Sequence, residues 1–248
     1  MIDYIAEQDR ALLERHGLAS FEALWALQLE PVDEPNTERG GWSSVCRLEL
    51  DGVAYYLKRQ SGYLTRSLLR PAGEPTFARE IRTIFRYAKL GIPALQAAFY
   101  AERPVDGERC AVLLTRALDG WQDLDNWLVR WSQLASGQRE AILNACGQLA
   151  RRLHQAGQMH GCFYPKHIFL QEHTDGFAAC LIDLEKTRPL LLGRRDRIKD
   201  IEPLLRRALE WSPADVRVFL NAYLQDERAV DDWAARLGAR RKHKESRR

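Results

Sequence analysis

The sequence of 248 residues has no long apolar run and no recognisable export signal. A membrane-spanning helix needs roughly eighteen consecutive apolar residues, and no stretch approaches this length. The first residues, Met1-Ile2-Asp3-Tyr4, lack the positive segment and apolar stretch of a secretory signal. Because apolar residues still make up 46% of the chain and charged residues 29%, we expect a soluble globular protein with a buried core.

Cysteine is sparse, and the spacing of a zinc site is missing. The chain has five cysteines, and none belongs to a CxxC pair: Cys46, Cys110, Cys146, Cys162 and Cys180. The odd number and the scatter argue against a disulfide framework and a zinc site, and they favour a reducing compartment. Internal repeats and low-complexity linkers are absent as well.

Excess positive charge is missing from most of the chain. The net charge is +3, but residues 239–248 alone carry a net +5. The other residues therefore sum to −2, with 31 basic and 33 acidic side chains. A nucleic-acid-binding protein usually has a basic body, so we expect no nucleic-acid partner. The short basic tail suits an anionic membrane surface, and a disordered solubilising tail is the alternative.

The first half of the sequence has the pattern of a helical segment followed by a β-rich lobe. Residues 3–28 are predicted to be helical, with a break near Gly17. Two runs of alternating polarity flank Asp51-Gly52, which predicts a β-hairpin. Two further strands are expected at 95–101 and 109–115.

The second half is predicted to be mostly helical. Residues 137–156 form one helix with an apolar face, made of Ile142, Ala145, Leu149 and Leu153. Two short apolar runs, 168–170 and 179–182, predict a small hairpin, and Ser212-Pro213 begins another helix. The chain is therefore expected to have an α+β fold, with a β-rich lobe, a connection near 115–120 and an α-rich lobe.

Three features of the β-rich lobe are candidates for chemistry. Small residues enter the hairpin at Gly40-Gly41-Trp42-Ser43-Ser44, and such a turn lets backbone N–H groups approach phosphate oxygens. Lys58 ends the second strand of the hairpin. Glu80 lies in a helix predicted at 76–90, off its apolar face of Phe77, Ile81, Ile84, Phe85 and Ala88. Taken singly, the three have ordinary alternatives: a turn, a solvated lysine and a surface glutamate.

A fourth feature lies in the α-rich lobe. The loop His160-Gly161-Cys162-Phe163-Tyr164-Pro165-Lys166-His167 precedes the first strand of the small hairpin, and Asp183 follows the second. A carboxylate after an apolar strand, downstream of such a loop, fits a metal site between two hairpin strands. For His160 or His167 alone, a hydrogen-bonded buried histidine is the alternative.

The order of the four features resembles the plan of protein kinases. The loop from His160 to Leu170 aligns without gaps to the kinase catalytic loop HRDLKPENILL, with His167 at the metal-binding Asn. Asp183 takes the place of the DFG aspartate. A His in place of the metal-binding Asn, and Asp-Leu in place of Asp-Phe-Gly, resemble the bacterial lipopolysaccharide core kinases of the Kdo/WaaP group, especially its InaA-like branch. The resemblance covers roughly residues 35–225.

This resemblance implies a two-lobed protein-kinase-like fold and phosphoryl transfer from ATP. Lys58 would bind the α- and β-phosphates and pair with Glu80, and Asp183 would bind Mg²⁺ with His167 nearby. Adenine would be contacted by the backbone of a hinge near Thr115 and Ala117. The glycine turn would contribute Gly40, Gly41, Ser43 and Ser44.

The resemblance also implies supporting residues and an acceptor. His160 begins the catalytic loop, and Asp200 resembles the helix aspartate that braces this loop, with an acid at a helix start as its alternative. The family's acceptor is a heptose or Kdo sugar of the lipopolysaccharide inner core, at the cytoplasmic face of the inner membrane. A cytoplasmic protein, peripheral on that membrane, is therefore expected. Whether a partner protein is required stays open.

Cys162 departs from the family pattern, because active kinases have a catalytic aspartate there. A thiol with an unperturbed pKa of about 8.5 is a poor substitute for a carboxylate. Positioning and metal electrostatics carry most of phosphoryl transfer, and general-base help contributes roughly 10²–10⁴-fold. Glu185, two residues after Asp183, is a candidate substitute carboxylate.

The segment between Lys58 and Glu80 is a second place where two interpretations stay open. Arg66 and Arg70 lie four residues apart among leucines, as in a flap that contacts an anionic lipid or phosphorylated sugar. A solvated insertion with a small apolar anchor is the alternative.

The sequence therefore predicts a lipopolysaccharide core sugar kinase in four parts. These are an N-terminal helical extension, a kinase-like N-lobe, a kinase-like C-lobe and a basic tail, at residues 1–34, 35–117, 118–238 and 239–248. Cys162 favours one rival function, a pseudokinase that binds nucleotide and assists envelope biosynthesis or a stress response. A soluble small-molecule kinase is a second rival, which the basic tail disfavours.

Overall fold

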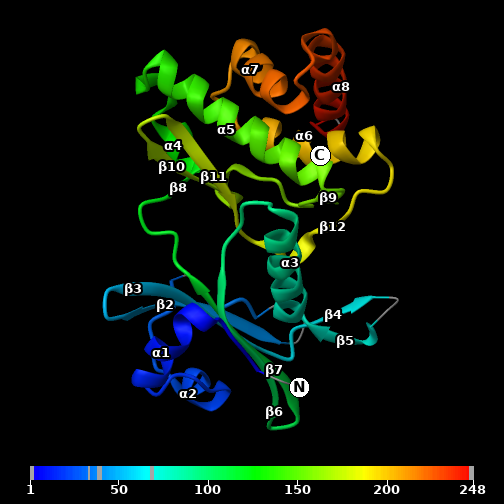
Figure 1. Cartoon of the computed structure of the whole chain (residues 1–248). Helices are drawn as coiled ribbons and strands as arrows, with labels where there is room; N and C mark the ends of the chain where they lie inside the picture. Colours follow the sequence, from blue (N-terminus) through cyan, green and yellow to red (C-terminus); the bar gives the residue numbers. More distant parts are fainter. Residues whose placement is uncertain (1–2, 33, 38–40, 68–69, 246–248) are drawn as a thin grey trace. The chain divides into compact units, whose positions relative to one another are not determined.

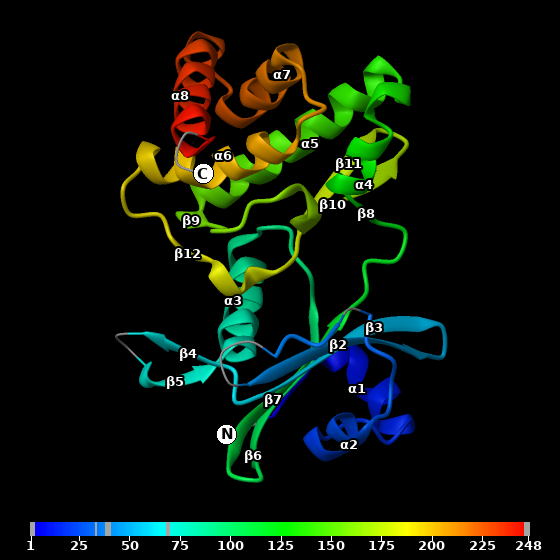
Figure 2. The same cartoon turned by 180° about the vertical axis from the view of Figure 1, so that it is seen from behind.

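The computed structural model describes residues 3–32, 34–37, 41–67 and 70–245 (Figures 1 and 2). The chain divides into two compact units: Met1–Arg86 with Leu95–Asp119, and Tyr87–Ala94 with Gly120–Arg248. The first unit is rich in strands and the second in helices, which confirms the expected α+β fold. The finer division into an extension, two lobes and a tail stays a prediction.

The first unit contains an antiparallel five-stranded sheet with the order β1-β6-β7-β3-β2. Its strands are β1 (Tyr4–Ile5), β2 (Trp42–Leu50), β3 (Val53–Ser61), β6 (Ala97–Val105) and β7 (Glu108–Arg116). β3 lies between β2 and β7, so its backbone is hydrogen-bonded to a neighbouring strand on both sides.

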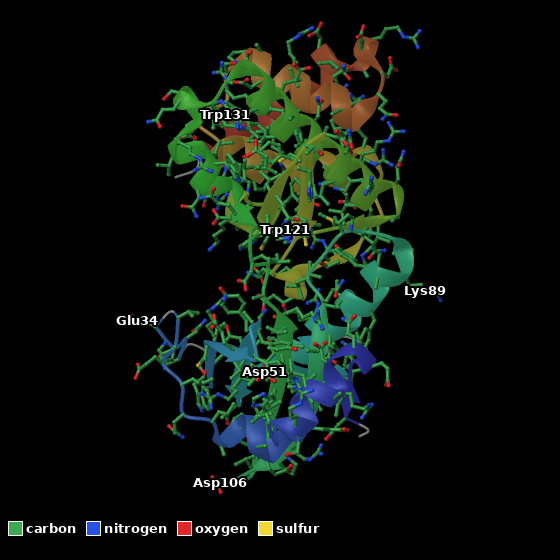
Figure 3. All side chains as sticks on the ribbon, turned by 60° about the vertical axis from the view of Figure 1, so that its left-hand side comes forward. Glu34, Asp51, Lys89, Asp106, Trp121 and Trp131 are labelled. Atoms are coloured by element: carbon green, nitrogen blue, oxygen red, sulfur yellow. The ribbon has the colours of Figure 1, made fainter. Side chains whose placement is uncertain are left out.

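Two Asp-Gly turns set the register of this sheet. Asp51-Gly52 joins β2 to β3, and Asp106-Gly107 joins β6 to β7 (Figure 3). Both residues of each turn have positive φ, which a two-residue type I′ turn requires. Glycine adopts this conformation without a Cβ clash, and aspartate tolerates it. The predicted hairpin is confirmed, and the two further strands are β6 and β7.

Two short helices pack against the sheet of the first unit. They are α1 (Glu7–Arg15) and α2 (Phe21–Ala26), separated by a bend at Gly17 with φ +67°. Leu13, Phe21 and Leu24 are buried with sheet residues Leu57, Phe99 and Leu114. The expectation of helix from residue 3 is wrong at Tyr4–Ile5, which pairs as an edge strand with Phe99 and Tyr100 of β6.

A hairpin and a long helix follow β3. The hairpin is formed by β4 (Leu64–Ser67) and β5 (Arg70–Pro75), and the helix is α3 (Thr76–Leu90). The side chains of residues 66–70, including the two arginines of the expected flap, lie outside the described residues. The predicted apolar face of α3 is partly wrong, since Phe85 and Ala88 are exposed whereas Glu80 and Tyr87 are buried.

The second unit is built around α5 (Ser136–Gln155). Its other helices are α4 (Leu124–Val129), α6 (Arg194–Arg207), α7 (Pro213–Leu224) and α8 (Glu227–Glu245). The predicted apolar face of α5 is buried along its whole length. Gly147 lets α7 cross α5 closely, because a Cβ here would lie 2.6 Å from Phe219 O and 2.7 Å from Ala222 Cβ.

Short strands frame the loops of the second unit. β8 (Gln122–Asp123), β10 (Ile168–His173) and β11 (Gly176–Leu181) form one antiparallel sheet, and β9 (Gln158–Met159) pairs with β12 (Arg188–Pro189). The predicted small hairpin is confirmed as β10 and β11. Ser212 begins α7 with a reciprocal capping box to Asp215, as the Ser-Pro signal predicts.

Asp9 fixes α1 to the sheet through a buried ion pair. Its side chain is fully buried, and Oδ1 accepts hydrogen bonds from Tyr55 Oη at 2.7 Å and Arg116 Nε at 2.9 Å. A buried carboxylate needs such donors, because it has lost its hydration. Asp9 therefore joins the N-terminal helix to β7 through Arg116 and to β3 through Tyr55.

We expect Asp9→Asn to lower the free energy of unfolding by about 2 kcal/mol, because an amide cannot replace the charge-assisted hydrogen bonds. Urea denaturation monitored by circular dichroism measures the change. Glu7→Gln is the matched control, since Glu7 pairs with Arg10 at the exposed surface, where such pairs contribute little. Equal midpoints for the two variants would contradict a stabilising role for Asp9.

Candidate functional site

In the first unit, Lys58 and Glu80 form an ion pair that is largely withdrawn from solvent. Lys58 Nζ lies 2.6 Å from Glu80 Oε1, with side-chain exposures of 17% and 4%. Leu57 faces the core, so the alternation of β3 turns Lys58 to the opposite face of the sheet. The solvated lysine and surface glutamate considered from the sequence are therefore not what the structure contains.

Gln60 fixes the helix that carries Glu80. Its buried side chain accepts hydrogen bonds from Thr76 Oγ1 at 2.7 Å and Phe77 N at 3.1 Å, and it donates to Tyr63 O at 2.6 Å. It thereby satisfies an amide at the start of α3. Sequence reasoning missed Gln60, although its position two residues after Lys58, on the same strand face, is a usable signal.

The glycine turn is partly described. Gly40 lies outside the described residues. Gly41 has a packing reason, because a Cβ there would lie 2.5 Å from Ser61 O and Tyr63 N. Ser43 N donates to Asn36 O at 2.8 Å, so this amide is already used within the unit. Ser44 Oγ is buried, and no described residue hydrogen-bonds it.

The predicted hinge lies at the end of β7. Thr115 is buried and pairs in register with Tyr56 and Ala97. Ala117 N donates to Ala54 O at 2.9 Å, which extends the sheet by one more hydrogen bond. The Ala117 N–H is therefore already satisfied, and a contact from this hinge to adenine stays a prediction.

In the second unit, Asp200 holds the start of the loop that resembles a kinase catalytic loop. Its Oδ2 accepts from His160 N and its Oδ1 from Gly161 N, both at 2.7 Å. His154 Nε2 lies 3.1 Å from Oδ2, and Tyr223 Oη lies 2.8 Å from His154 Nδ1. Asp200 is the seventh residue of α6, so it is not the acid at a helix start that was its alternative.

His160 links this loop to the segment before Asp183. The ring is fully buried, and Nε2 donates to Ile182 O at 2.9 Å because a carbonyl oxygen only accepts. Nδ1 then carries a lone pair and accepts from Cys162 N at 3.3 Å. Burial lowers the pKa of His160, which favours this neutral form.

His167 and Asp183 face one another across the small hairpin. His167 Nδ1 lies 2.8 Å from Cys162 O and must donate to it, so a neutral ring presents a bare Nε2. This nitrogen lies 3.2 Å from Asp183 Oδ2. Burial lowers the pKa of His167, against the opposing effect of the Asp183 carboxylate. In the neutral state two lone pairs thus converge, which is an arrangement that a cation would stabilise.

Asp183 also has an unusual backbone. Its φ of 57° and ψ of 61° place it in the left-handed region, outside any hairpin turn. Such conformations in residues other than glycine often mark functional sites, because the surrounding structure must hold them. Ile182 N donates to His167 O at 3.1 Å, so the backbone before Asp183 is tied to the loop that precedes the hairpin.

Cys162 lies within a small group of side chains in the second unit. It is buried, and its thiol group interacts electrostatically with the side chains of Tyr164 and Lys186. Burial, and then Cys162, raise the pKa of Tyr164. The guanidinium of Arg207 lies over the Tyr164 ring, 3.8 Å from its centroid. The carboxylate of Glu185 is half-buried and lies 3.7 Å from Lys186 Nζ.

The structure therefore brings the predicted residues together in two separate sets. The first unit holds Gly41, Ser43, Ser44, Lys58, Glu80, Thr115 and Ala117, and the second holds His160, Cys162, His167, Asp183, Glu185 and Asp200. Sequence reasoning missed Lys186 and Arg207. Their partners Cys162 and Tyr164 are remote in sequence, and the contacts arise only when the loop folds. The roles of both sets toward substrate stay predictions.

The described residues contain neither a cluster of metal ligands nor a membrane-spanning helix. No group of three or more His, Cys, Asp or Glu side chains is arranged to hold a metal ion in that part of the chain. Among the helices with described residues, none has the length and apolar character needed to cross a membrane.

Comparison with known proteins places this arrangement in a family. The sequence pattern of the Lipopolysaccharide kinase (Kdo/WaaP) family matches residues 22–223. Protein InaA of Escherichia coli (strain K12) is 33% identical over 180 residues, which are 71% of this chain and 82% of InaA. The structure of WaaP in complex with acyl carrier protein has a TM-score of 0.74 and 24% sequence identity, covering 100% of this chain and 99% of that one.

The structural likeness confirms the protein-kinase-like fold expected from the order of the motifs. The family pattern spans both units, from α2 to the end of α7, and includes every candidate residue described above. The relation to InaA agrees with the branch that the His167 and Asp183-Leu184 pattern resembles. The chain belongs to the lipopolysaccharide kinase (Kdo/WaaP) family.

Proposed function

We propose that this protein transfers a phosphoryl group from ATP to a heptose or Kdo sugar of the lipopolysaccharide inner core. The observation that carries the proposal is the convergence of His167 Nε2 and Asp183 Oδ2, 3.2 Å apart, beside a loop held by Asp200. Membership of the lipopolysaccharide kinase family supports the kind of reaction and the kind of acceptor. We assign ATP as the phosphoryl donor, Mg²⁺ as the metal and the sugar as the acceptor.

The donors of the second unit fit Mg²⁺ bound together with phosphate. Mg²⁺ is commonly held by one or two carboxylates plus substrate phosphates and water, so a cluster of three protein ligands is not needed. Asp183 supplies the carboxylate, and its side chain is 36% exposed. The Nε2 lone pair of His167 adds a second favourable group for a cation. Bound there, Mg²⁺ would neutralise charge on the transferred phosphoryl group.

The ion pair of the first unit suits the phosphates of a nucleotide. Glu80 is almost fully buried, so it holds the Lys58 ammonium in one position. An ammonium fixed in this way is a point charge for phosphate oxygens. We infer that Lys58 binds phosphate and that Glu80 and Gln60 are positioning residues.

The group that accepts the proton of the acceptor hydroxyl is where this chain departs most from active kinases. Cys162 replaces the aspartate of active kinases, and Glu185 is the carboxylate nearest in sequence to Asp183 on its C-terminal side. We infer that Glu185 accepts the proton of the acceptor hydroxyl while Lys186 balances its charge. Phosphoryl transfer depends mostly on positioning and electrostatics, so a relocated base is compatible with turnover.

A pseudokinase is the second candidate function, and the buried thiol at Cys162 favours it. Such a protein would bind nucleotide and assist envelope biosynthesis or a stress response without catalysis. In either case we propose a peripheral location on the inner face of the inner membrane, with the basic segment 239–248 as one contact. A WaaP structure contains acyl carrier protein, which supports a partner protein for this chain as well.

We expect Mg-ATP to raise the melting temperature of the wild-type protein, and Asp183→Asn to remove the metal-dependent part of that shift. Differential scanning fluorimetry measures binding, and transfer of labelled phosphate to purified core oligosaccharide measures activity. Asp175→Asn, in the exposed turn between β10 and β11, is the matched control. Binding without transfer identifies the pseudokinase, and a failure to bind Mg-ATP refutes both candidates.

We expect Glu185→Gln to lower the rate of transfer by about 10²-fold or more, because the amide cannot accept a proton. The affinity for Mg-ATP should change little, since Asp183 and Lys58 remain. Single-turnover transfer to core oligosaccharide is the measurement, with Glu140→Gln on the exposed face of α5 as control. An unchanged rate in Glu185→Gln rules out this carboxylate as the base.

A further inference from the structure

A short segment before α6 exposes two neighbouring leucines. The side chains of Leu191 and Leu192 are 82% and 58% exposed. Other large apolar side chains exposed in the described residues, such as Val129 and Leu209, are isolated from one another in sequence. Single exposed apolar residues are ordinary on protein surfaces, whereas an adjacent pair is a candidate for an interaction.

The backbone of this segment is held in place, so the leucines are presented by an ordered structure. Asp196 Oδ2 accepts from Leu191 N at 3.0 Å and Leu192 N at 2.8 Å. Leu190 N donates to Gly157 O at 2.8 Å, and Gly193 turns the chain into α6 with φ +50°. The hydrogen bonds from Leu192 and Leu191 lower the pKa of Asp196, against the effect of its burial, so this carboxylate stays charged and bound near neutral pH.

Positive charge surrounds the leucines. Arg188, Arg194 and Arg195 are exposed on either side of them. Arg194 forms an ion pair with Asp232 and lies over the ring of Trp233, so the start of α6 is attached to α8. Asp232 and Trp233 lie in the first half of α8 (Glu227–Glu245), so the start of α6 contacts that part of the helix.

We propose that segment 190–195 is a membrane-docking loop whose occupant is the surface of an anionic phospholipid bilayer. Leu191 and Leu192 insert at the level of the acyl chains, and Arg188 and Arg195 bind lipid phosphates. Apolar side chains bordered by cations fit the boundary between headgroups and acyl chains, whereas a purely apolar patch would fit a groove on a protein better. Because a single weak membrane anchor gives only marginal binding, this loop supplies a second contact in addition to the segment 239–248.

Vesicle flotation tests the loop directly. The full chain is mixed with vesicles of phosphatidylglycerol and phosphatidylcholine, or of phosphatidylcholine alone, without nucleotide or lipopolysaccharide. We expect binding to the anionic vesicles, and at least tenfold weaker binding by the double variant Leu191→Ser with Leu192→Ser. The control double variant Val129→Ser with Leu209→Ser removes equally exposed apolar groups elsewhere and should bind as the wild type does.

A second pair of substitutions tests the cations. Arg188→Gln with Arg195→Gln should weaken binding to anionic vesicles and reduce its dependence on salt, because fewer lipid charges are then neutralised. Melting temperatures of all variants should stay at the wild-type value, since the changed side chains are exposed. Phosphoryl transfer to soluble oligosaccharide should also persist in the leucine variant, which separates this inference from the proposed function.

Three outcomes would overturn the proposal. One is equal vesicle binding by the wild type and the leucine variant. Another is binding that depends wholly on residues 239–248, so that their removal abolishes it and the leucines add nothing. The third is loss of self-association in the leucine variant, measured by light scattering, with no vesicle binding by the wild type, because the leucines would then contact a second copy of the chain.

Discussion

The loop of the second unit depends on one buried carboxylate, that of Asp200. A charge without water must be surrounded by donors, and Asp200 takes them from His160, Gly161 and His154. Because Asp200 lies in the middle of α6, this helix and the loop cannot move independently. The same helix carries Asp196 near its start and Arg207 at its end. Asp196 holds the backbone of segment 190–195, and the guanidinium of Arg207 lies over the Tyr164 ring. The helix α6 therefore positions segment 190–195, the loop that begins at His160 and the Arg207 guanidinium.

The parts of the fold that the sequence predicts follow local rules. Asp51-Gly52 encodes a tight turn through two residues that accept positive φ, and the alternation on either side sets the register. The apolar period of α5 predicts its buried face, because apolar side chains at helical spacing form one stripe that turns to the core. The order of Lys58, Glu80, His160 and Asp183 predicts the family, because each residue type has a fixed place in that plan.

The parts that the sequence does not predict depend on contacts between distant segments. Glu80 was placed on the polar side of its helix, yet it is buried because Lys58 arrives from β3 to balance its charge. Tyr4–Ile5 become a strand because β6 offers an unpaired edge. The amides of Ser43 and Ala117 are used by Asn36 and Ala54, which no local pattern reveals. The tautomers of the two loop histidines likewise follow only from the carbonyl groups that they meet.

The close crossing of α5 and α7 at Gly147 affects more than the packing of these two helices. Tyr223, in the same turn of α7 as the contact, hydrogen-bonds His154, which in turn hydrogen-bonds Asp200. A methyl group at position 147 would push α7 outward and pull on this chain of polar groups. Substitutions remote from the loop can therefore retune it, and homologues that differ in turnover need not differ at any residue that touches substrate.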